Sequence, residues 1–407
     1  MTGIKKVAVL GGGAAGFFAA LSAKSHHPQA EVILFEKTTK VLAKVKVSGG
    51  GRCNVTNAIS DISELCMAYP RGGKQLRNSF HRFDTADTIN WFESRGVALK
   101  TESDGRVFPV SNDSQTIINC LLDEVQQLGV TIAYQSSVQS MVFQRDQWQI
   151  NFSTGASPQL FDRVIVATGG SPKLSNFDWL EDLGHLIIRP VPSLFTFNMP
   201  EESITNLTGV VVENAKVRIL GLGIETSGPL LITHWGMSGP AILKASSFGA
   251  RELSKFDYQF DIQVNWVSER NTEIIYQELE RCVTAYPQKM ITNQKAFPLP
   301  NRLWVFLLDK CGIPDNKRWS ELGKKKARQL AELLANDLYK VSGKTTFKDE
   351  FVTCGGVALS HINLKTMSSK SCTGLYFAGE VLDIDAITGG FNFQAAWTTA
   401  YIAGQLA

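Results

Sequence analysis

Charged residues are scarce in this sequence, and the two signs nearly cancel. Asp, Glu, Lys and Arg make up only 19% of the 407 residues, which argues against long disordered tails. The 41 Lys and Arg exceed the 38 Asp and Glu by three, so the formal net charge is +3. So small an excess gives no reason to expect a nucleic-acid partner or an anionic membrane surface.

Cysteine pairs and long apolar runs are also absent from the sequence. Seven cysteines are scattered along the chain without any Cys-x-x-Cys spacing, so we expect neither a disulfide framework nor a metal site built on cysteine. No apolar run reaches the roughly 18 residues that a membrane-spanning helix needs. The sequence therefore predicts a soluble, cytoplasmic protein with reduced thiols, no metal and no membrane partner.

The N-terminal pattern is typical of a parallel α/β sheet. Lys6–Leu10 is a short apolar strand, three glycines follow, residues 14–25 have helical composition, and residues 31–36 form a second apolar strand. Further helices are predicted over residues 84–96 and 114–128. A hairpin is predicted from residues 138–143 and 147–152, and an apolar strand over residues 163–167.

The character of the sequence changes near Pro190 and changes back near residue 351. Short strand-like runs fill residues 191–265, and helical patterns follow at 273–283 and 319–341. A buried strand at 375–378 and a terminal helix over 393–406 then resume the first pattern. We predict a discontinuous domain of residues 1–190 and 350–407. It is interrupted by residues 191–349, which are β-rich at 191–265 and helical at about 266–345.

The turn between the first predicted strand and the first predicted helix contains a nucleotide-binding fingerprint. Gly11-Gly12-Gly13-Ala14-Ala15-Gly16 has G-x-G-x-x-G spacing and lies between a strand and a helix, as the motif requires. Gly11 permits the tight turn, Gly13 lets the backbone approach a pyrophosphate, and Gly16 allows close helix–strand packing. Glu36 ends the second strand, where a carboxylate accepts hydrogen bonds from ribose hydroxyls.

Three further segments favour FAD over NAD. Residues 164–170 resemble the strand and Ala-Thr-Gly turn of two-dinucleotide-binding flavoproteins. Residues 374–380 resemble their second FAD segment, although Glu380 stands where Asp is usual. Residues 389–393 open the last helix, and a helix N-terminus stabilises negative charge on the flavin ring.

One segment resembles the signature of a bacterial flavoprotein family. Residues 48–57 read Ser-Gly-Gly-Gly-Arg-Cys-Asn-Val-Thr-Asn, and the likeness extends to residues 233–241 and 353–357, so it covers essentially the whole chain. The family is that of NAD(P)/FAD-dependent oxidoreductases, also described as aminoacetone oxidase family FAD-binding enzymes, and is related to bacterial bile-acid reductases. Ser360-His361 stands where the family usually has an acid.

The resemblance implies an α/β fold of defined architecture. It implies a discontinuous, Rossmann-like FAD-binding domain of the two-dinucleotide-binding type, with an inserted middle domain that has a β-barrel-like part and a helical part. The patterns and the resemblance together assign FAD contacts to Gly11, Gly13, Ala14, Ala15, Gly16, Glu36, Lys37, Lys44, Ser48, Gly49, Gly50, Gly51, Arg52, Cys53, Asn54, Val138, Thr168, Gly169, Gly379, Glu380, Gly390, Phe391, Asn392 and Phe393.

Catalytic residues are not identified by any motif. Arg52 is a candidate for holding an anionic substrate or the flavin anion, Cys53 is either a redox thiol or a packed residue, and His234 is either a donor to substrate or a loop residue. The run from Lys324 to Lys326 favours a solvated helix face over an RNA contact. Hydride transfer to flavin depends on geometry more than on a dedicated base.

Two classes of function remain open. The first is an FAD-dependent oxidoreductase that acts on a small organic substrate held between the flavin and the inserted domain, with NAD(P)H as a transient reductant. No second G-x-G-x-x-G provides a dedicated NAD(P)H domain, and an oxidase that uses O₂ on an amine-type substrate is the close alternative. The second class is a flavoprotein that acts on tRNA or another macromolecule. The oligomeric state is left open.

Overall fold

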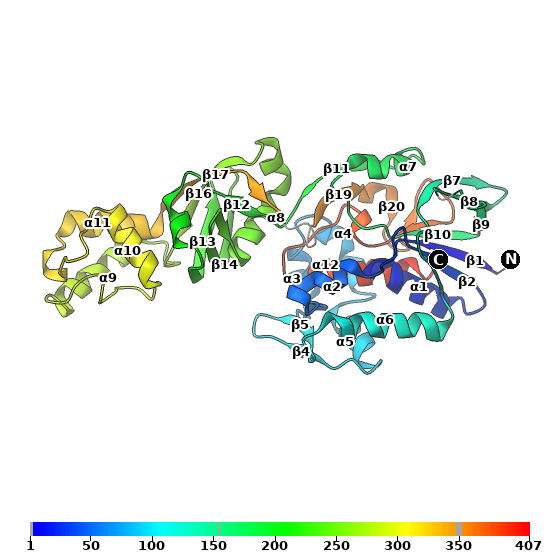
Figure 1. Ribbon diagram of the computed structural model, residues 1–407, viewed down its shortest axis with the longest axis horizontal. Helices are drawn as coiled ribbons and strands as arrows, with labels where there is room; N and C mark the ends of the chain where they lie inside the picture. The colour runs from blue at the N-terminus through cyan, green and yellow to red at the C-terminus, as the bar shows by residue number, and fades with distance from the viewer. Residues whose placement is uncertain (1–2, 154, 347–351) are drawn as a thin grey trace. The chain divides into compact units, whose positions relative to one another are not determined.

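The chain folds as two compact units. The computed structural model describes residues 3–153, 155–346 and 352–407. The first unit contains the described residues up to 193 and from 352 onward, and the second contains residues 194–346. Each unit has its own hydrophobic core. In Figure 1 the second unit runs from green through yellow to orange.

A parallel sheet forms the centre of the first unit. The strands lie in the order β22–β10–β1–β2–β6, so a strand from near the C-terminus completes a sheet that the N-terminus begins. Val7 and Val9 are fully buried because layers cover both faces of the sheet. Two short antiparallel strands extend the edge beyond β22. The bounds are β1 Lys6–Leu10, β2 Glu31–Phe35, β6 Thr131–Ala133, β10 Arg163–Val166, β22 Leu375–Phe377, β21 Ser368–Ser369 and β20 Ile362–Asn363.

Helices cover one face of this sheet and a small antiparallel sheet covers the other. Helices α1 (Ala14–His26), α6 (Ser114–Leu128) and α12 (Phe391–Ala403) pack together on the first face. The small sheet consists of β7 (Val138–Gln144), β8 (Gln147–Phe152) and β9 (Gln159–Phe161). Phe35, on β2, meets the rings of Phe152 and Phe161 at centroid distances of 5.0 and 5.7 Å. Its neighbour Leu34 faces Gly16 on α1, as strand alternation requires.

Local helix signals in the first unit are confirmed. Asp84 caps α5 in a capping box with Asp87, and α6 begins and ends at the predicted residues, with Gly129 in the left-handed conformation just after it. β11 pairs antiparallel with β19. The remaining bounds are α2 Ala43–Val47, α3 Ile62–Met67, α4 Gly73–Phe80, α5 Thr85–Glu93, α7 Asp178–Glu181, β3 Thr56–Asn57, β4 Leu99–Thr101, β5 Arg106–Pro109, β11 Ile187–Pro192 and β19 Thr353–Val357.

The second unit is built on a sheet that closes into a barrel, as the resemblance implies. The strand order is β17–β16–β13–β14–β15–β12–β18, and β17 and β18 are the two halves of one strand bent at Gly343. Because β17 pairs with β16 and β18 pairs with β12, that strand joins both ends of the sheet. The bounds are β12 Thr196–Asn198, β13 Val211–Ile219, β14 Ile224–Thr233, β15 Gly236–Ser238, β16 Gln259–Asn265, β17 Asp337–Ser342 and β18 Lys344–Thr345.

Four α-helices complete the described part of the second unit, and two sequence predictions need correction. The helix predicted over residues 319–341 is wrong at both ends, because α11 begins only at Lys324, after a 3₁₀ turn and Gly323, and stops at 335, where β17 follows. Asp337, Tyr339 and Val341 are buried in alternation, which is a strand period. The β-rich stretch 191–265 also contains α8. The bounds are α8 Pro240–Lys255, α9 Thr272–Ala285, α10 Asn301–Lys310 and α11 Lys324–Ala335.

Among the helices of the described residues, none combines the length and the apolar character needed to cross a bilayer.

Candidate flavin site

The fingerprint turn has the geometry that its glycines require. Gly11 has φ +111°, and a Cβ there would lie 2.4 Å from the carbonyl oxygen of Ala167, the residue after β10. A Cβ on Gly16 would lie 1.8 Å from the Gly11 oxygen, so α1 can approach the turn only because residue 16 is glycine. Gly13 differs, because a Cβ there would meet no atom within 4 Å. Gly13 thus borders open space at the start of α1.

The start of α1 is free of capping side chains and of acids. Gly13 is its N-cap residue, no side chain accepts a hydrogen bond from the first turn, and Ala14 and Ala15 follow. The helix is 13 residues long. Its first N–H groups and the positive end of its dipole are therefore available to an anion such as a pyrophosphate.

Glu36 is held at the end of β2 by backbone donors. Its carboxylate accepts hydrogen bonds from the N–H of Gly12 at 2.9 Å and of Thr38 at 2.8 Å. Lys37 is exposed, and Val138, at the start of β7, is half-buried. The backbone oxygen of Glu36 accepts a hydrogen bond from the N–H of Ser136, two residues before Val138. The segments that carry Glu36 and Val138, both predicted to contact FAD, are therefore neighbours.

The glycine triplet makes a tight left-handed turn. Gly49, Gly50 and Gly51 have φ values of +58°, +69° and +85°, which strain any other residue type. A Cβ on Gly50 or Gly51 would meet nothing within 4 Å, so both face open space. Ser48, just before them, donates its hydroxyl to the Val45 oxygen at 2.9 Å.

The glycine triplet loop, residues 48–57, is tied through its second half to the start of α12, more than 300 residues away. The Asn54 amide is oriented so that both its oxygen and its nitrogen are hydrogen-bonded. The oxygen accepts from the N–H of Gly390 at 2.8 Å, and the nitrogen donates to the Thr56 oxygen at 3.0 Å. Asn57 donates to the Gly389 oxygen at 3.0 Å. A Cβ on Gly390 would lie 2.4 Å from the Thr56 oxygen, so the two segments touch through their backbones.

The start of α12 also lacks a capping side chain and an acid. Gly390 is its N-cap residue at φ +90°. Phe391 is buried, and Phe393 stacks on Trp397 with ring centroids 5.7 Å apart. Asn392 exchanges hydrogen bonds with the Ala386 backbone, which fixes the turn that leads into the helix. The positive end of this 13-residue helix therefore lies beside the glycine triplet loop.

Glu380 links its own segment to Lys44 and to the start of β19. Its carboxylate accepts from the Lys44 ammonium at 2.7 Å and from the N–H of Thr353 at 2.8 Å. Gly379, just before it, has φ +75°. Thr168 is exposed, and Gly169 faces open space at φ +74°. The ion pair between Lys44 and Glu380 has no local sequence signal, because the residues are 336 positions apart.

Cys53 is held as a neutral thiol. It is fully buried, and burial raises its pKa to about 12, while a hydrogen bond with the Ser48 side chain opposes this shift. Only a thiolate is strongly nucleophilic or readily oxidised. Cys53 is therefore a packed residue of the glycine triplet loop. It lacks the ionisation near neutral pH that a redox thiol needs.

Arg52 is neutralised by a partner that no sequence motif indicates. Its guanidinium donates to Glu102 at 2.7 Å and lies 4.0 Å from the ring centre of Phe108. Glu102 also pairs with Arg106 at 3.1 Å. The charged turn at residues 102–106 is the one sequence feature that could have suggested such a partner. His234 lies in the second unit, where it is exposed and its ring meets the edge of Trp235 at 4.3 Å.

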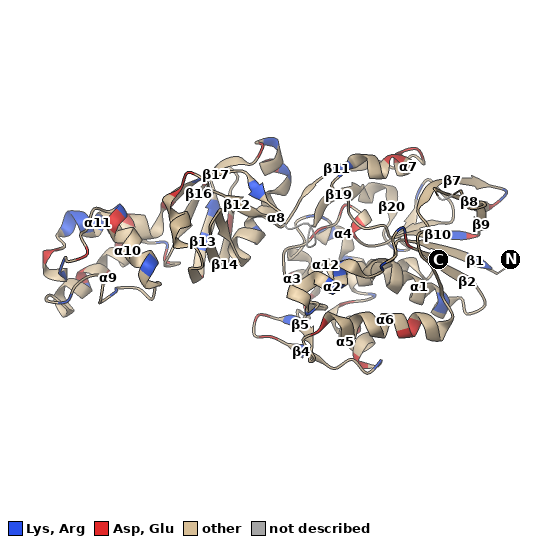
Figure 2. Ribbon diagram, in the orientation of Figure 1, with Lys and Arg blue, Asp and Glu red and all other residues tan. Residues whose placement is uncertain are grey.

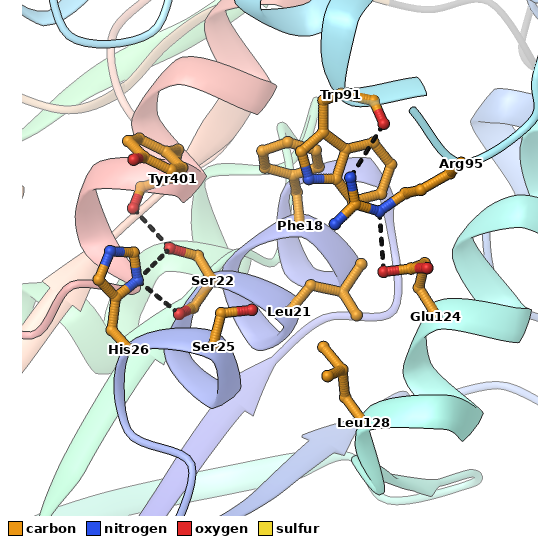
Figure 3. Close-up of a pocket in the computed structure, with 10 residues that line it drawn as sticks. All are labelled: Phe18, Leu21, Ser22, Ser25, His26, Trp91, Arg95, Glu124, Leu128 and Tyr401. Carbon is orange, nitrogen blue, oxygen red and sulfur yellow. Dashed lines mark hydrogen bonds and ion pairs between the residues drawn. The ribbon is translucent and has the colours of Figure 1, made fainter. Parts of the chain in front are cut away.

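A small cleft elsewhere in the first unit is unrelated to these glycines. It has a volume of about 50 Å³ and lies beside α1, at Phe18, Ser22 and His26 (Figure 3). Arg95 closes its other side by stacking on Trp91 at 3.9 Å and pairing with Glu124 at 2.8 Å. The fingerprint turn is at the opposite end of α1.

The residues present fit FAD. Gly13, Gly50, Gly51 and Gly169 all leave open space where any other residue would place a side chain. The start of α1 suits the pyrophosphate, and Glu36 suits a ribose. The start of α12, with the glycine triplet loop, suits the anionic edge of a reduced isoalloxazine ring.

Comparisons with known proteins agree with this geometry. Residues 5–406 match the family model described as HI0933-like protein Rossmann domain. The 3-dehydro-bile acid delta(4,6)-reductase of Clostridium scindens is 27% identical over 416 residues, covering 99% of both chains. The ribosomal RNA dihydrouridine synthase of Escherichia coli is 28% identical over 406 residues, covering 98% of this chain and 96% of that protein.

Solved structures of flavoenzymes share the fold. The 3-ketosteroid delta1-dehydrogenase of Sterolibacterium denitrificans has a TM-score of 0.50 at 12% identity, covering 98% of each chain. Quinol fumarate reductase of E. coli has a TM-score of 0.51 at 12% identity, covering 99% of this chain and 70% of that one. The chain therefore belongs to the HI0933-like family of Rossmann proteins that bind FAD, and it is an FAD-dependent oxidoreductase.

Proposed function

We propose that this enzyme reduces a carbon–carbon double bond conjugated with a carbonyl group. The two named relatives support the reaction class, because a delta(4,6)-reductase and a dihydrouridine synthase both saturate such a bond. When bound and reduced, FAD would supply the hydride, and a proton from solvent or a side chain would complete the addition. NAD(P)H is the proposed source of electrons for the flavin, as a transient co-substrate.

The uncapped start of α12 beside the glycine triplet loop is the observation that carries this proposal. A helix N-terminus stabilises negative charge, so it favours a reduced, anionic flavin as the resting electron donor. Gly50 and Gly51 leave the loop backbone open to a flat ring. The buried, neutral Cys53 offers no competing thiolate. The arrangement suits hydride donation from the flavin, a reaction that depends on how the substrate is positioned against the ring.

The identity of the substrate stays open between two classes. The bile-acid relative favours a small organic enone, and the dihydrouridine synthases favour a uracil base within RNA. Both relatives cover nearly the whole chain at similar identity, so identity does not separate them. The residues assigned to FAD contact, the placement of substrate against the inserted domain and the cytoplasmic location stay predictions.

Anaerobic rapid mixing tests the reductase proposal. We expect NADPH or NADH to bleach the visible absorbance of the bound flavin. We then expect a steroid 4-en-3-one, or a uridine-containing RNA, to restore the absorbance faster than air-saturated buffer does. Failure of both nicotinamide nucleotides to reduce the flavin would contradict the proposed electron source. Reoxidation that is fastest with O₂ would instead favour the oxidase.

A further inference from the structure

The charge of this protein is unevenly divided between its two units. Residues 194–347 hold 19 Lys and Arg against 16 Asp and Glu, whereas the rest of the chain holds 22 of each. The net charge of +3 therefore belongs wholly to the second unit. The near-equal numbers of basic and acidic residues in the whole chain, from which we expected no nucleic-acid partner, conceal this difference between the two units.

The excess is concentrated in one stretch of the helical part. Residues 317–328 contain six Lys and Arg and a single acid, Glu321. Backbone hydrogen bonds fix a neighbouring loop against the start of this stretch: Ile291 donates to Lys317 at 3.0 Å and Trp319 donates to Lys289 at 3.1 Å. Lys289 therefore lies beside Lys317. Figure 2 colours the ribbon blue at the Lys and Arg positions of α11.

This arrangement is rigid, because buried tryptophans anchor it. Trp319 is fully buried and donates to the Gln294 oxygen at 2.9 Å, and Trp304, also fully buried, donates to the Ile291 oxygen at 2.9 Å. The cations therefore project from a fixed base and lose little conformational freedom beyond that of their own side chains when a ligand binds.

Lys324 and Lys325 do not stabilise the helix that they begin. Lys324 and Lys325 lie in the first turn of α11, where the helix dipole disfavours positive charge, and that turn has no acid and no capping side chain. Both are exposed, and within the described part of the chain neither makes an ion pair. The side chains of Lys289, Lys317 and Arg318 also make no ion pair there, although the backbone N–H of Arg318 donates to the Glu321 carboxylate at 3.1 Å. A local arrangement that opposes folding is expected where a ligand supplies the missing charge.

We propose that five cations form a surface that binds the phosphodiester backbone of RNA. This basic surface consists of Lys289, Lys317, Arg318, Lys324 and Lys325. An exposed aromatic ring at Tyr286 and the amide of Gln288, which accepts from Arg318 at 2.7 Å, lie on the same loop as Lys289. Cations with an adjacent aromatic platform suit a single strand, whose bases are free to stack.

This proposal rests on the proposed function only for the group that is reduced, a uracil base. A surface in the second unit would recruit an RNA whose uracil is then reduced in the first. RNA binding is measurable without turnover, so it can fail or succeed separately from the reductase chemistry.

Charge reversal in the full-length holoenzyme tests the surface. The probe is a fluorescein-labelled single-stranded RNA of mixed sequence, followed by anisotropy at several salt concentrations. We expect Lys324→Glu with Lys325→Glu to weaken binding by about tenfold or more and to lower the slope of log affinity against log salt by about one to two. Because acids suit a helix N-terminus, the thermal midpoint should be unchanged or higher.

A matched control distinguishes an effect of the basic surface from an effect of the protein's net charge. Lys255→Glu with Lys340→Glu makes the same change in net charge in the same unit, at exposed positions on α8 and β17. We expect this variant to bind RNA like the wild type. FAD content and reduction by NADPH should be equal in all three proteins.

Three results would overturn the inference. The first is equal RNA affinity in the two double variants, and the second is wild-type binding that does not depend on salt. The third is a loss confined to phosphatidylglycerol vesicles, with RNA affinity intact, which would assign the surface to a membrane.

Discussion

The glycines of the predicted FAD site differ in what surrounds them. Gly16 and Gly390 are packed against backbone, since a Cβ on them would lie 1.8 and 2.4 Å from a carbonyl oxygen. Gly13 has empty space around the same position and an extended backbone at φ −92°, which any residue adopts. The first two glycines are therefore needed for folding, and Gly13 is needed only for what binds beside it.

This difference predicts opposite results for two substitutions in one motif. Gly13→Ala should leave the thermal stability of the apoprotein unchanged and weaken FAD binding by about tenfold, because its methyl group occupies the space for the pyrophosphate. Gly16→Ala should cost about 1–3 kcal/mol of folding stability, because α1 must shift from the turn. Flavin fluorescence titration and thermal unfolding separate the two effects. Equal loss of apoprotein stability in both variants would refute the distinction.

His185 makes the stability of the first unit depend on pH. Burial lowers its pKa, Nε2 lies 2.9 Å from the Ser369 hydroxyl, and Nδ1 lies 3.3 Å from the Leu180 oxygen. The carbonyl requires Nδ1 to carry the proton in the neutral ring, so Nε2 accepts from Ser369. Below about pH 6.5 the unfolded chain binds a proton that the folded chain resists.

The free energy of unfolding should therefore fall as the pH drops through that range. His185→Gln should reduce the slope of stability against pH between about pH 7 and 5, where one proton accounts for at most ~1.4 kcal/mol per pH unit. Urea unfolding at each pH measures the slope. An unchanged slope in the variant would show that His185 does not titrate on unfolding.

At the scale of elements, a buried ion pair connects the α3–α4 turn to the turn before α12. Arg71 donates to Asp385 through two nitrogens, with Nε 2.6 Å from the carboxylate, and Asp385 is completely buried. The Ser193 hydroxyl also donates to Asp385 at 2.7 Å. Burial raises the pKa of Asp385, and Arg71 opposes that shift. The pair helps to hold the segment that leads to Gly390.

Removing one partner of this pair should be costly. Asp385→Ala leaves the Arg71 guanidinium buried without its carboxylate, and we expect a loss of about 3–5 kcal/mol in chemical denaturation. Glu252→Ala removes the partner of Lys255 in an exposed ion pair and should cost less than ~1 kcal/mol. Similar losses in the two variants would mean that Asp385 does not anchor this segment.

At the scale of the whole molecule, two separate cores imply separate unfolding. The fingerprint turn, the glycine triplet loop and α12 all belong to the first unit. The second unit has its own core, in which Asp337 accepts hydrogen bonds from Trp266 at 2.9 Å and from Lys310 at 2.5 Å. FAD should therefore stabilise only one of the two units directly.

Calorimetry should resolve this difference. We expect two thermal transitions, and FAD at about 100 times its dissociation constant should raise the midpoint of one of them, by the equivalent of ~2.7 kcal/mol. Asp337→Ala should lower the midpoint of the other. A single transition that responds to both changes would indicate that the units unfold together.

Local patterns in the sequence by themselves determine much of the first unit. The strand Lys6–Leu10, the fingerprint and the bounds of α6 follow from short-range physics: apolar runs, turn glycines and capping residues act within a few positions. The glycines of the flavin site are predictable for the same reason, since a turn that needs positive φ selects glycine locally.

Features that depend on distant partners arise only when the chain folds. Residues 337–342 become a strand because β16 pairs with them, although the preceding pattern is helical. Arg52 is neutralised by Glu102, and Asn54 meets Gly390, through contacts that no local spacing records. The placement of the cations beside α11 likewise arises when the Lys289 loop folds against Lys317. Sequence patterns act over a few residues, whereas these contacts join segments that only folding brings together.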